Sequence, residues 1–197
     1  GQRLLVWIQL NADTSSTRTV FRNVAADIQI EFKLANVDPN GNCTGGVNRV
    51  NSNLAYGSSN SVKALSYWPS NKYLNVWLVN TIGSFGSLAG TILGYAQFPS
   101  SGRLNTYGLV CRNDQWGSIE SAIGSGGRTV THEVGHCFNL FHPFQSGCGF
   151  SCTNSGDRVC DTPPTSGQTF GCNYTNNTCS NDATGGSALN LNPFTTN

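Results

Sequence analysis

The chain has 197 residues, a net charge of +1, and charged side chains at only 11% of its positions. This length allows one domain with a real core and is too short for two ordinary domains. The charge balance excludes the clustered basic face that binding to nucleic acid or an anionic membrane requires. No stretch approaches the roughly 18 apolar residues of a membrane-spanning helix.

Five strands are predicted along the chain. Residues 3–10 form a continuous apolar run that predicts a buried strand, although a helix end of this length would show the same pattern. Residues 28–34 alternate strictly between apolar and polar side chains, which predicts a half-buried strand. The remaining strands are predicted at residues 73–79, 92–98 and 106–111.

The segments between these strands have their own signatures. Residues 11–27 carry apolar side chains spaced for one face of a short helix, and the segment is long enough for a parallel crossover, which needs roughly a dozen residues. Asp38, Pro39, Asn40 and Gly41 predict a turn, because proline pre-sets φ and Asn-Gly tolerates positive φ. Residues 41–66 are rich in Gly, Asn and Ser and are predicted to be a surface loop.

All three histidines of the chain lie in one stretch, within and after a helix predicted at about residues 128–138. His132 and His136 are four residues apart, so on a helix they lie one turn apart and can point at the same ion. Glu133 lies beside the pair and is free to handle a proton. His142 completes a set of three ligands if the chain turns back after the helix.

Three protein ligands leave the fourth position of Zn²⁺ open, which is typical of a catalytic zinc site. Water at such a position is acidified to a pKa near ~7 and becomes a good nucleophile. The alternative is an ordinary helix face that matches the motif by chance. The third histidine, at the spacing of the long motif, favours the metal site.

The stretch from His132 to His142 resembles the H-E-x-x-H-x-x-G-x-x-H signature of the metzincin metallopeptidases. His-Pro-Phe-Gln from His142, followed by Gly-Asp-Arg-Val-Cys-Asp-Thr-Pro from Gly156, is similar to the pappalysin/ulilysin (cytophagalysin) branch. The resemblance runs from about residue 28 to residue 170. Asn139 replaces the glycine of the signature, and asparagine is the non-glycine residue that most readily adopts the required positive φ.

The resemblance implies an α/β fold of the metzincin type. We expect one catalytic domain over residues 1–197, with a twisted mixed sheet of about five strands and a zinc-binding active-site helix in residues 1–142. Residues 143–197 should form a disulfide-rich, loop-rich C-terminal subdomain. Metzincins place their edge strand beside the metal, so residues 92–98 are expected to pair with an extended protein or peptide substrate.

The resemblance also implies the activity of a zinc metalloendopeptidase, with His132, His136 and His142 as zinc ligands and Glu133 as the catalytic proton carrier. Metzincins place a methionine turn beneath the metal, and this chain has no methionine. We expect a further C-terminal segment to supply that turn. The alternatives are a catalytically impaired or truncated metzincin-like module that binds zinc and acts by binding, and a zinc hydrolase of small molecules.

Eight cysteines and the low charge indicate a secreted protein in which most cysteines form disulfides. The alternative, a second zinc held by Cys148, Cys152 and their neighbours, lacks the repeated two-residue spacing of a zinc ribbon. Three Asn-x-Thr triplets, at Asn42, Asn173 and Asn176, have the form of glycosylation acceptors. The absence of an initial methionine favours a processed form from which a signal and a propeptide were removed.

A second metal is implied by the segment after the zinc helix. In the pappalysin-like branch this loop is associated with Ca²⁺, and the matching positions are Asp157, Asp161 and Thr162. Carboxylate and carbonyl oxygens in a helix-poor loop suit this hard cation. The alternative is that these acidic side chains cap turns.

Overall fold

The computed structural model describes a defined part of the chain, and its residues fall into two units, one up to Asn139 and one from Leu140 onward. The strand predicted at residues 3–10 and the helix predicted within residues 11–27 lie outside the described part. The single catalytic domain expected over residues 1–197 stays a prediction. The structure describes residues 28–84, 91–117, 119–149, 153–159, 162, 164–168, 178 and 179.

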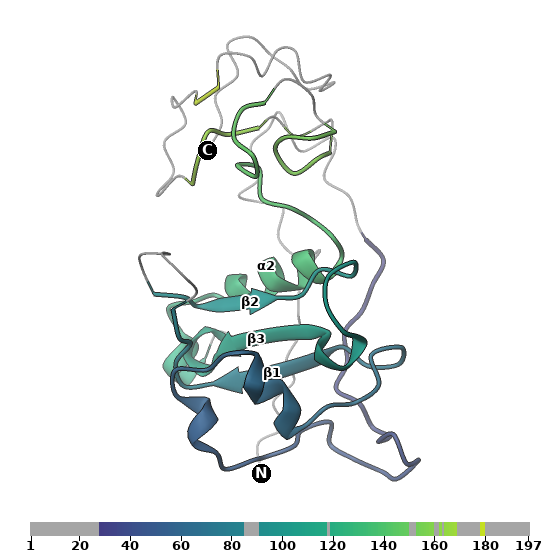
Figure 1. The fold of residues 1–197 in the computed structure, drawn as a ribbon. Coiled ribbons are helices and arrows are strands. Elements are labelled where there is room, and N and C mark those ends of the chain that lie inside the picture. Colours follow the sequence, from purple (N-terminus) through teal and green to yellow (C-terminus); the bar gives the residue numbers. More distant parts are fainter. Residues whose placement is uncertain are drawn as a thin grey trace. The chain divides into compact units, whose positions relative to one another are not determined.

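The described residues of the first unit form a three-stranded mixed sheet (Figure 1). Its strands are β1 (Asn75–Val79), β2 (Gly94–Ala96) and β3 (Gly108–Arg112), in the order β1-β3-β2. β3 pairs in parallel with β1 and antiparallel with β2, so among the described residues β2 is an edge strand. The strands predicted at residues 73–79, 92–98 and 106–111 are therefore confirmed, with somewhat shorter bounds.

The central strand β3 is buried on both faces, which explains its apolar sequence. Leu109 and Cys111 point to one face and join a cluster with residues of the helix α2 (Arg128–Cys137). Val110 points to the other face and packs with Trp77. In Figure 1, α2 runs along β2 on one side of the sheet.

α2 is the only α-helix within the described ranges, and it begins and ends close to the predicted bounds. Val130, Val134 and Cys137 are spaced by four and three residues, and all three are buried against the sheet. The other helices are short 3-10 segments: η1 (Asn53–Ala55), η2 (Asn60–Leu65), η3 (Leu104–Thr106), η4 (Asn113–Gln115) and η5 (Glu120–Ala122).

Two predictions about the first unit need correction. Residues 28–34 form no strand in the structure. Their apolar side chains do not all face the core: Phe32 packs against it, while Ile28 and Leu34 are exposed. Residues 41–66 are not a plain loop but carry η1 and η2. Of the five predicted strands, three therefore form within the described ranges.

The turn predicted from Asp38 to Gly41 is confirmed. Gly41 has a φ of 88°, and its N–H donates to the Asp38 carbonyl at 3.1 Å. The Asp38 carboxylate accepts from the backbone N–H groups of Asn40 and Asn42, at 2.9 and 2.8 Å. These bonds hold the pKa of Asp38 below its usual value, with the Asn42 bond the largest cause.

The predicted disulfides are confirmed only in part. Cys148 and Cys179 are bonded in the second unit. Cys43, Cys111 and Cys137 are free thiols, so the expectation that most cysteines pair does not hold for the described residues. The physical reason is clear for Cys111 and Cys137, which are buried among apolar side chains and act as small core residues.

No helix in the part of the chain that the structure describes is both long and apolar enough to cross a membrane.

Lys63 in η2 is an unusual core residue, because it is only 2% exposed. Its ammonium group donates to the Thr106 carbonyl at 2.8 Å and lies over the rings of Trp77 and Tyr95, at 5.3 and 5.4 Å from their centroids. Burial lowers the pKa of Lys63 from 10.5 to about 8, because removing water disfavours the charged form.

This buried amine predicts a pH effect on stability. The folded protein releases the Lys63 proton near pH 8, whereas the unfolded chain holds it up to about pH 10.5. The unfolded state therefore binds more protons in that interval, and the Lys63 contribution to the free energy of unfolding rises with pH. Between pH 8 and pH 9, we expect the free energy of unfolding of the wild-type protein to rise by about 1 kcal/mol relative to that of a Lys63→Met variant.

Urea unfolding of both proteins across this pH range measures the difference, in which the titration of Cys111 cancels. Exposed Lys72, changed to methionine, is the matched control and should follow the wild-type profile. Identical profiles for wild type and Lys63→Met would show that the amine is not perturbed by folding.

Candidate metal centre

The site is built on one face of α2. His132 and His136 lie one turn apart, and their Nε2 atoms are 3.0 Å from each other. Their rings meet edge to face, with centroids 4.6 Å apart. The His132 imidazole is exposed to solvent, whereas His136 is buried, with only 8% of its surface exposed.

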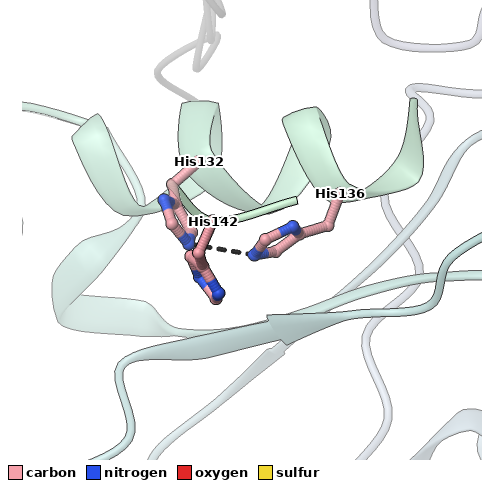
Figure 2. A group of neighbouring side chains, drawn as sticks. All are labelled: His132, His136 and His142. Carbon is pink, nitrogen blue, oxygen red and sulfur yellow. Dashed lines mark hydrogen bonds between the residues drawn. The ribbon is translucent and has the colours of Figure 1, made fainter. Parts of the chain in front are cut away.

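His142 is the third predicted ligand, and its ring stacks on Phe144 with centroids 4.6 Å apart. One ligand atom from each of His132, His136 and His142 lies within 4.8 Å of the other two. Figure 2 shows the three rings converging on the same region beside the helix. Three nitrogen donors at this spacing could hold one metal ion.

The state of the His132 imidazole also suits a metal. Burial lowers the pKa of His132, and the neighbouring His136 lowers it further. A lower pKa favours the neutral ring at pH 7, which is the form that binds a metal.

The helix ends as the sequence predicts. Asn139 has a φ of 69°, the left-handed conformation expected where the signature has glycine. Its N–H donates to the His136 carbonyl at 2.9 Å, and this bond closes the last turn.

Asn139 gives a stability prediction. We expect Asn139→Ala to lower the free energy of unfolding by about 1–2 kcal/mol, because alanine is strained at positive φ. Asn139→Gly should be neutral within about 0.5 kcal/mol, since glycine accepts this conformation freely. Urea unfolding of the metal-free protein measures both changes. Exposed Asn113 in η4, changed to alanine, is the control, and equal effects of Ala and Gly at residue 139 would contradict the conformational argument.

Glu133 lies beside the histidines and is 5% exposed. Burial raises the pKa of its carboxyl group to about 7. Its Oε2 atom has no hydrogen-bond partner among the residues that the structure describes. A buried carboxyl with an unsatisfied oxygen and a pKa near neutrality is typical of a group that exchanges protons during a reaction.

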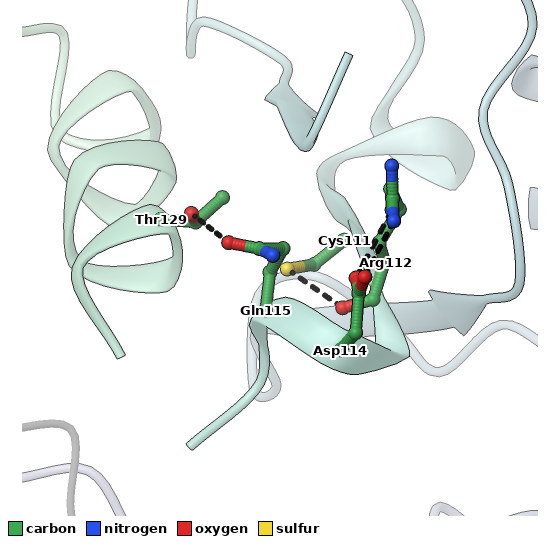
Figure 3. A network of polar contacts seen from close by, with 5 residues as sticks. All are labelled: Cys111, Arg112, Asp114, Gln115 and Thr129. Atoms are coloured by element: carbon green, nitrogen blue, oxygen red, sulfur yellow. Dashed lines mark hydrogen bonds and ion pairs between the residues drawn. The ribbon is translucent and has the colours of Figure 1, made fainter. Parts of the chain in front are cut away.

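Contacts with the segments just before and just after β3 fix both ends of α2. Near the last turn, the Tyr107 hydroxyl donates to the Cys137 carbonyl at 2.6 Å. In the first turn, the Thr129 hydroxyl donates to Gln115 Oε1 at 3.1 Å (Figure 3). Gln115 belongs to η4. Arg112, the last residue of β3, forms an ion pair with Asp114 in η4, and its side-chain hydrogen bonds lower the pKa of Asp114.

The edge strand also contributes to the site. Phe98, just after β2, packs against the His136 ring with centroids 5.1 Å apart. Gly94 in β2 lies against Glu133. Neither contact was predicted; the apolar pattern marked this segment as a strand but could not show which residues face the helix.

The predicted calcium ligands are only partly described. The Asp157 carboxylate accepts from the Val159 N–H at 2.9 Å, which is the turn-capping role given above as the alternative. The Thr162 N–H donates to the Val159 carbonyl at 3.1 Å. Asp161 lies outside the described residues, so calcium binding by Asp157, Asp161 and Thr162 stays a prediction.

A helix that carries two histidines and a buried glutamate along an edge strand, with a third histidine after a left-handed turn, defines the metzincin class of metallopeptidases. Comparison with known proteins gives the family. A model of peptidase family M43, described as pregnancy-associated plasma protein-A, matches residues 57–190. The chain belongs to this family, which confirms the resemblance to pappalysin/ulilysin-like metzincins.

Similar proteins agree with this assignment. An extracellular metalloprotease of Colletotrichum graminicola is 35% identical over 115 residues, which cover 55% of this chain and 36% of the relative. An extracellular metalloprotease of Sordaria macrospora is 32% identical over 143 residues, which cover 66% of this chain and 44% of the relative. The chain therefore spans less than half the length of these relatives.

Among solved structures, Tannerella forsythia mature mirolysin in complex with a cleaved peptide is similar with a TM-score of 0.72 and 36% identity. The match covers 90% of this chain and 67% of that chain. A structure of mirolysin with a small-molecule compound matches with the same TM-score, 34% identity and the same coverage.

Proposed function

We propose that the protein is a secreted zinc-dependent endopeptidase. The observation that carries the proposal is the set of three imidazole ligand atoms within 4.8 Å of one another, with the buried carboxyl of Glu133 on the helix that carries two of these imidazoles. This donor set fits Zn²⁺, which is typically held by three protein ligands in catalytic sites. Family membership and the extracellular metalloproteases among its relatives support the same proposal.

Each residue has a distinct role in this proposal. His132, His136 and His142 hold the zinc, which when bound supplies the Lewis acidity that polarises a peptide carbonyl and acidifies water. Glu133 accepts a proton from the attacking water and delivers it to the leaving amine. Burial raises the pKa of this carboxyl group to about 7, which makes it easier to protonate than an exposed glutamate.

The edge strand is the proposed docking place for substrate. β2 pairs with β3 on one side only, within the described residues, and lies along α2. An extended peptide could add to the other side of β2 through backbone hydrogen bonds, with its own backbone carbonyl near the metal. Mirolysin was solved in complex with a cleaved peptide, which supports a peptide substrate for the present chain as well.

Secretion is supported by two observations. The Cys148–Cys179 disulfide needs an oxidising compartment to persist. Several relatives are named extracellular metalloproteases.

The direct test is to incubate the purified protein with an unfolded protein, with and without a zinc chelator, and to identify fragments by mass spectrometry. We expect internal cleavage that the chelator abolishes and that added zinc restores. Cleavage of small esters without cleavage of peptides would favour a small-molecule hydrolase. Stoichiometric zinc without turnover would favour a module that acts by binding.

A further inference from the structure

Gly94 occupies a position in β2 where the backbone does not require glycine. It is absent from the residues with positive φ, so an alanine could adopt its backbone conformation. The neighbouring strand residue Ala96 packs in the cluster of α2, while Tyr95 packs in the cluster on the opposite face. The alternation of a strand therefore directs position 94 toward α2.

Space is the limiting factor at this position. A Cβ atom on Gly94 would lie 3.0 Å from Glu133 Cγ, 3.1 Å from Glu133 Oε1 and 3.1 Å from Thr129 Cγ2. These separations are shorter than ordinary van der Waals contacts of about 3.5–4.0 Å between carbon atoms. The Glu133 side chain thus fills the volume that a side chain at residue 94 would take.

Glu133 has little freedom to give way. The residue is 5% exposed, and its Oε2 atom has no hydrogen-bond partner in the described ranges. No hydrogen bond to Oε2 in the described ranges positions this carboxyl group. Packing against the Gly94 backbone therefore helps to fix its position. Small displacements of a catalytic group are costly, since about 1 Å can lower a rate by about 100-fold.

We propose that Gly94 is a positioning residue for Glu133: the missing side chain in the edge strand lets the carboxyl group lie against the strand, in line with a peptide that pairs there. This inference rests on the proposed endopeptidase function. In this role Gly94 acts only through Glu133, whatever backbone bonds β2 makes with a substrate.

The test begins with Gly94→Ala. We expect kcat for peptide cleavage to fall by about 10- to 100-fold, with KM changed by less than about twofold and zinc content unchanged. Gly124→Ala is the matched control, because a Cβ there has no atom within 4 Å and the backbone φ is not positive. Wild-type kcat in Gly94→Ala would overturn the proposal.

A double-mutant cycle separates positioning from a general effect on the strand. Glu133→Asp shortens the side chain by one methylene group and makes room for a Cβ at residue 94. In the Glu133→Asp background, Gly94→Ala should lower kcat by less than about threefold, because the two changes share one contact. An equal loss of kcat in both backgrounds would overturn the proposal.

A stability cycle covers the case in which Gly94→Ala is too unstable to assay. Gly94→Ala should lower the melting temperature less in a Glu133→Ala background than in the wild type, because the two Glu133 atoms close to the new Cβ are gone and only Thr129 Cγ2 remains. Equal lowering in both backgrounds would overturn the proposal. Absence of any cleavage by the wild-type protein would refute the proposed function instead, and the melting temperatures would still test the contact.

Discussion

Replacing Glu133 by alanine should lower kcat for peptide cleavage by about 10²–10⁴-fold, the usual contribution of a general acid and base. The structure gives two reasons to expect an effect of this size. The carboxyl group is buried next to the imidazole cluster, and its pKa of about 7 allows it to take up and release a proton at neutral pH.

The same substitution should leave metal binding and folding intact. Glu133 is not among the three side chains whose ligand atoms cluster, so we expect one zinc per chain in Glu133→Ala. Removing a buried carboxyl with an unsatisfied oxygen should not lower the melting temperature of the metal-free protein. Steady-state kinetics, metal analysis and thermal unfolding measure the three quantities.

The control for Glu133→Ala is a substitution of an exposed glutamate. Glu31→Ala removes an exposed carboxyl whose ion pair with Lys33 lies at the surface, so its kinetics should match the wild type. Undiminished cleavage by Glu133→Ala would refute the role of Glu133, even if zinc were bound.

Replacing His136 by alanine should abolish stoichiometric zinc binding. His136 is the buried member of the cluster, and its Nε2 lies 3.0 Å from that of His132. Loss of a direct ligand should lower zinc affinity by more than about 100-fold, because even the loss of an outer partner costs 10- to 100-fold.

The loss should also appear in stability. Zinc at a thousand times its Kd stabilises a folded protein by about 4 kcal/mol, so adding zinc should raise the wild-type melting temperature by several degrees. His136→Ala should show almost no rise at the same zinc concentration. Glu133→Ala is the internal control, because it keeps all three imidazoles, and an unchanged zinc response in His136→Ala would place the metal elsewhere.

The candidate metal site shows which predictions a sequence supports well. The spacing of His132 and His136 fixes their separation on any helix, and the left-handed turn at Asn139 follows from local backbone preferences. Both features depend on a few neighbouring residues. For the same reason, the bounds of α2 and the turn at Asp38–Gly41 were predicted correctly.

Other predictions failed where a local pattern needs a distant partner. The alternation at residues 28–34 is as regular as that of a true strand, yet the structure places no strand there. Cys111 and Cys137 look like candidates for disulfides, yet the fold uses them as core residues on β3 and α2. Composition cannot separate these cases, because pairing and burial depend on what the rest of the chain brings alongside.

The sequence by itself determined the chemical groups of the candidate zinc site and the relative positions of His132, Glu133 and His136, since the α-helix alone sets the spacing of these three residues. Only the tertiary structure decided the surroundings of that chemistry. Three contacts join segments that are far apart in the chain: Glu133 with Gly94, His136 with Phe98, and the buried Lys63 amine with the Thr106 carbonyl. Such contacts arise from packing of the sheet and α2, and packing at a distance leaves no signal in the local residue pattern.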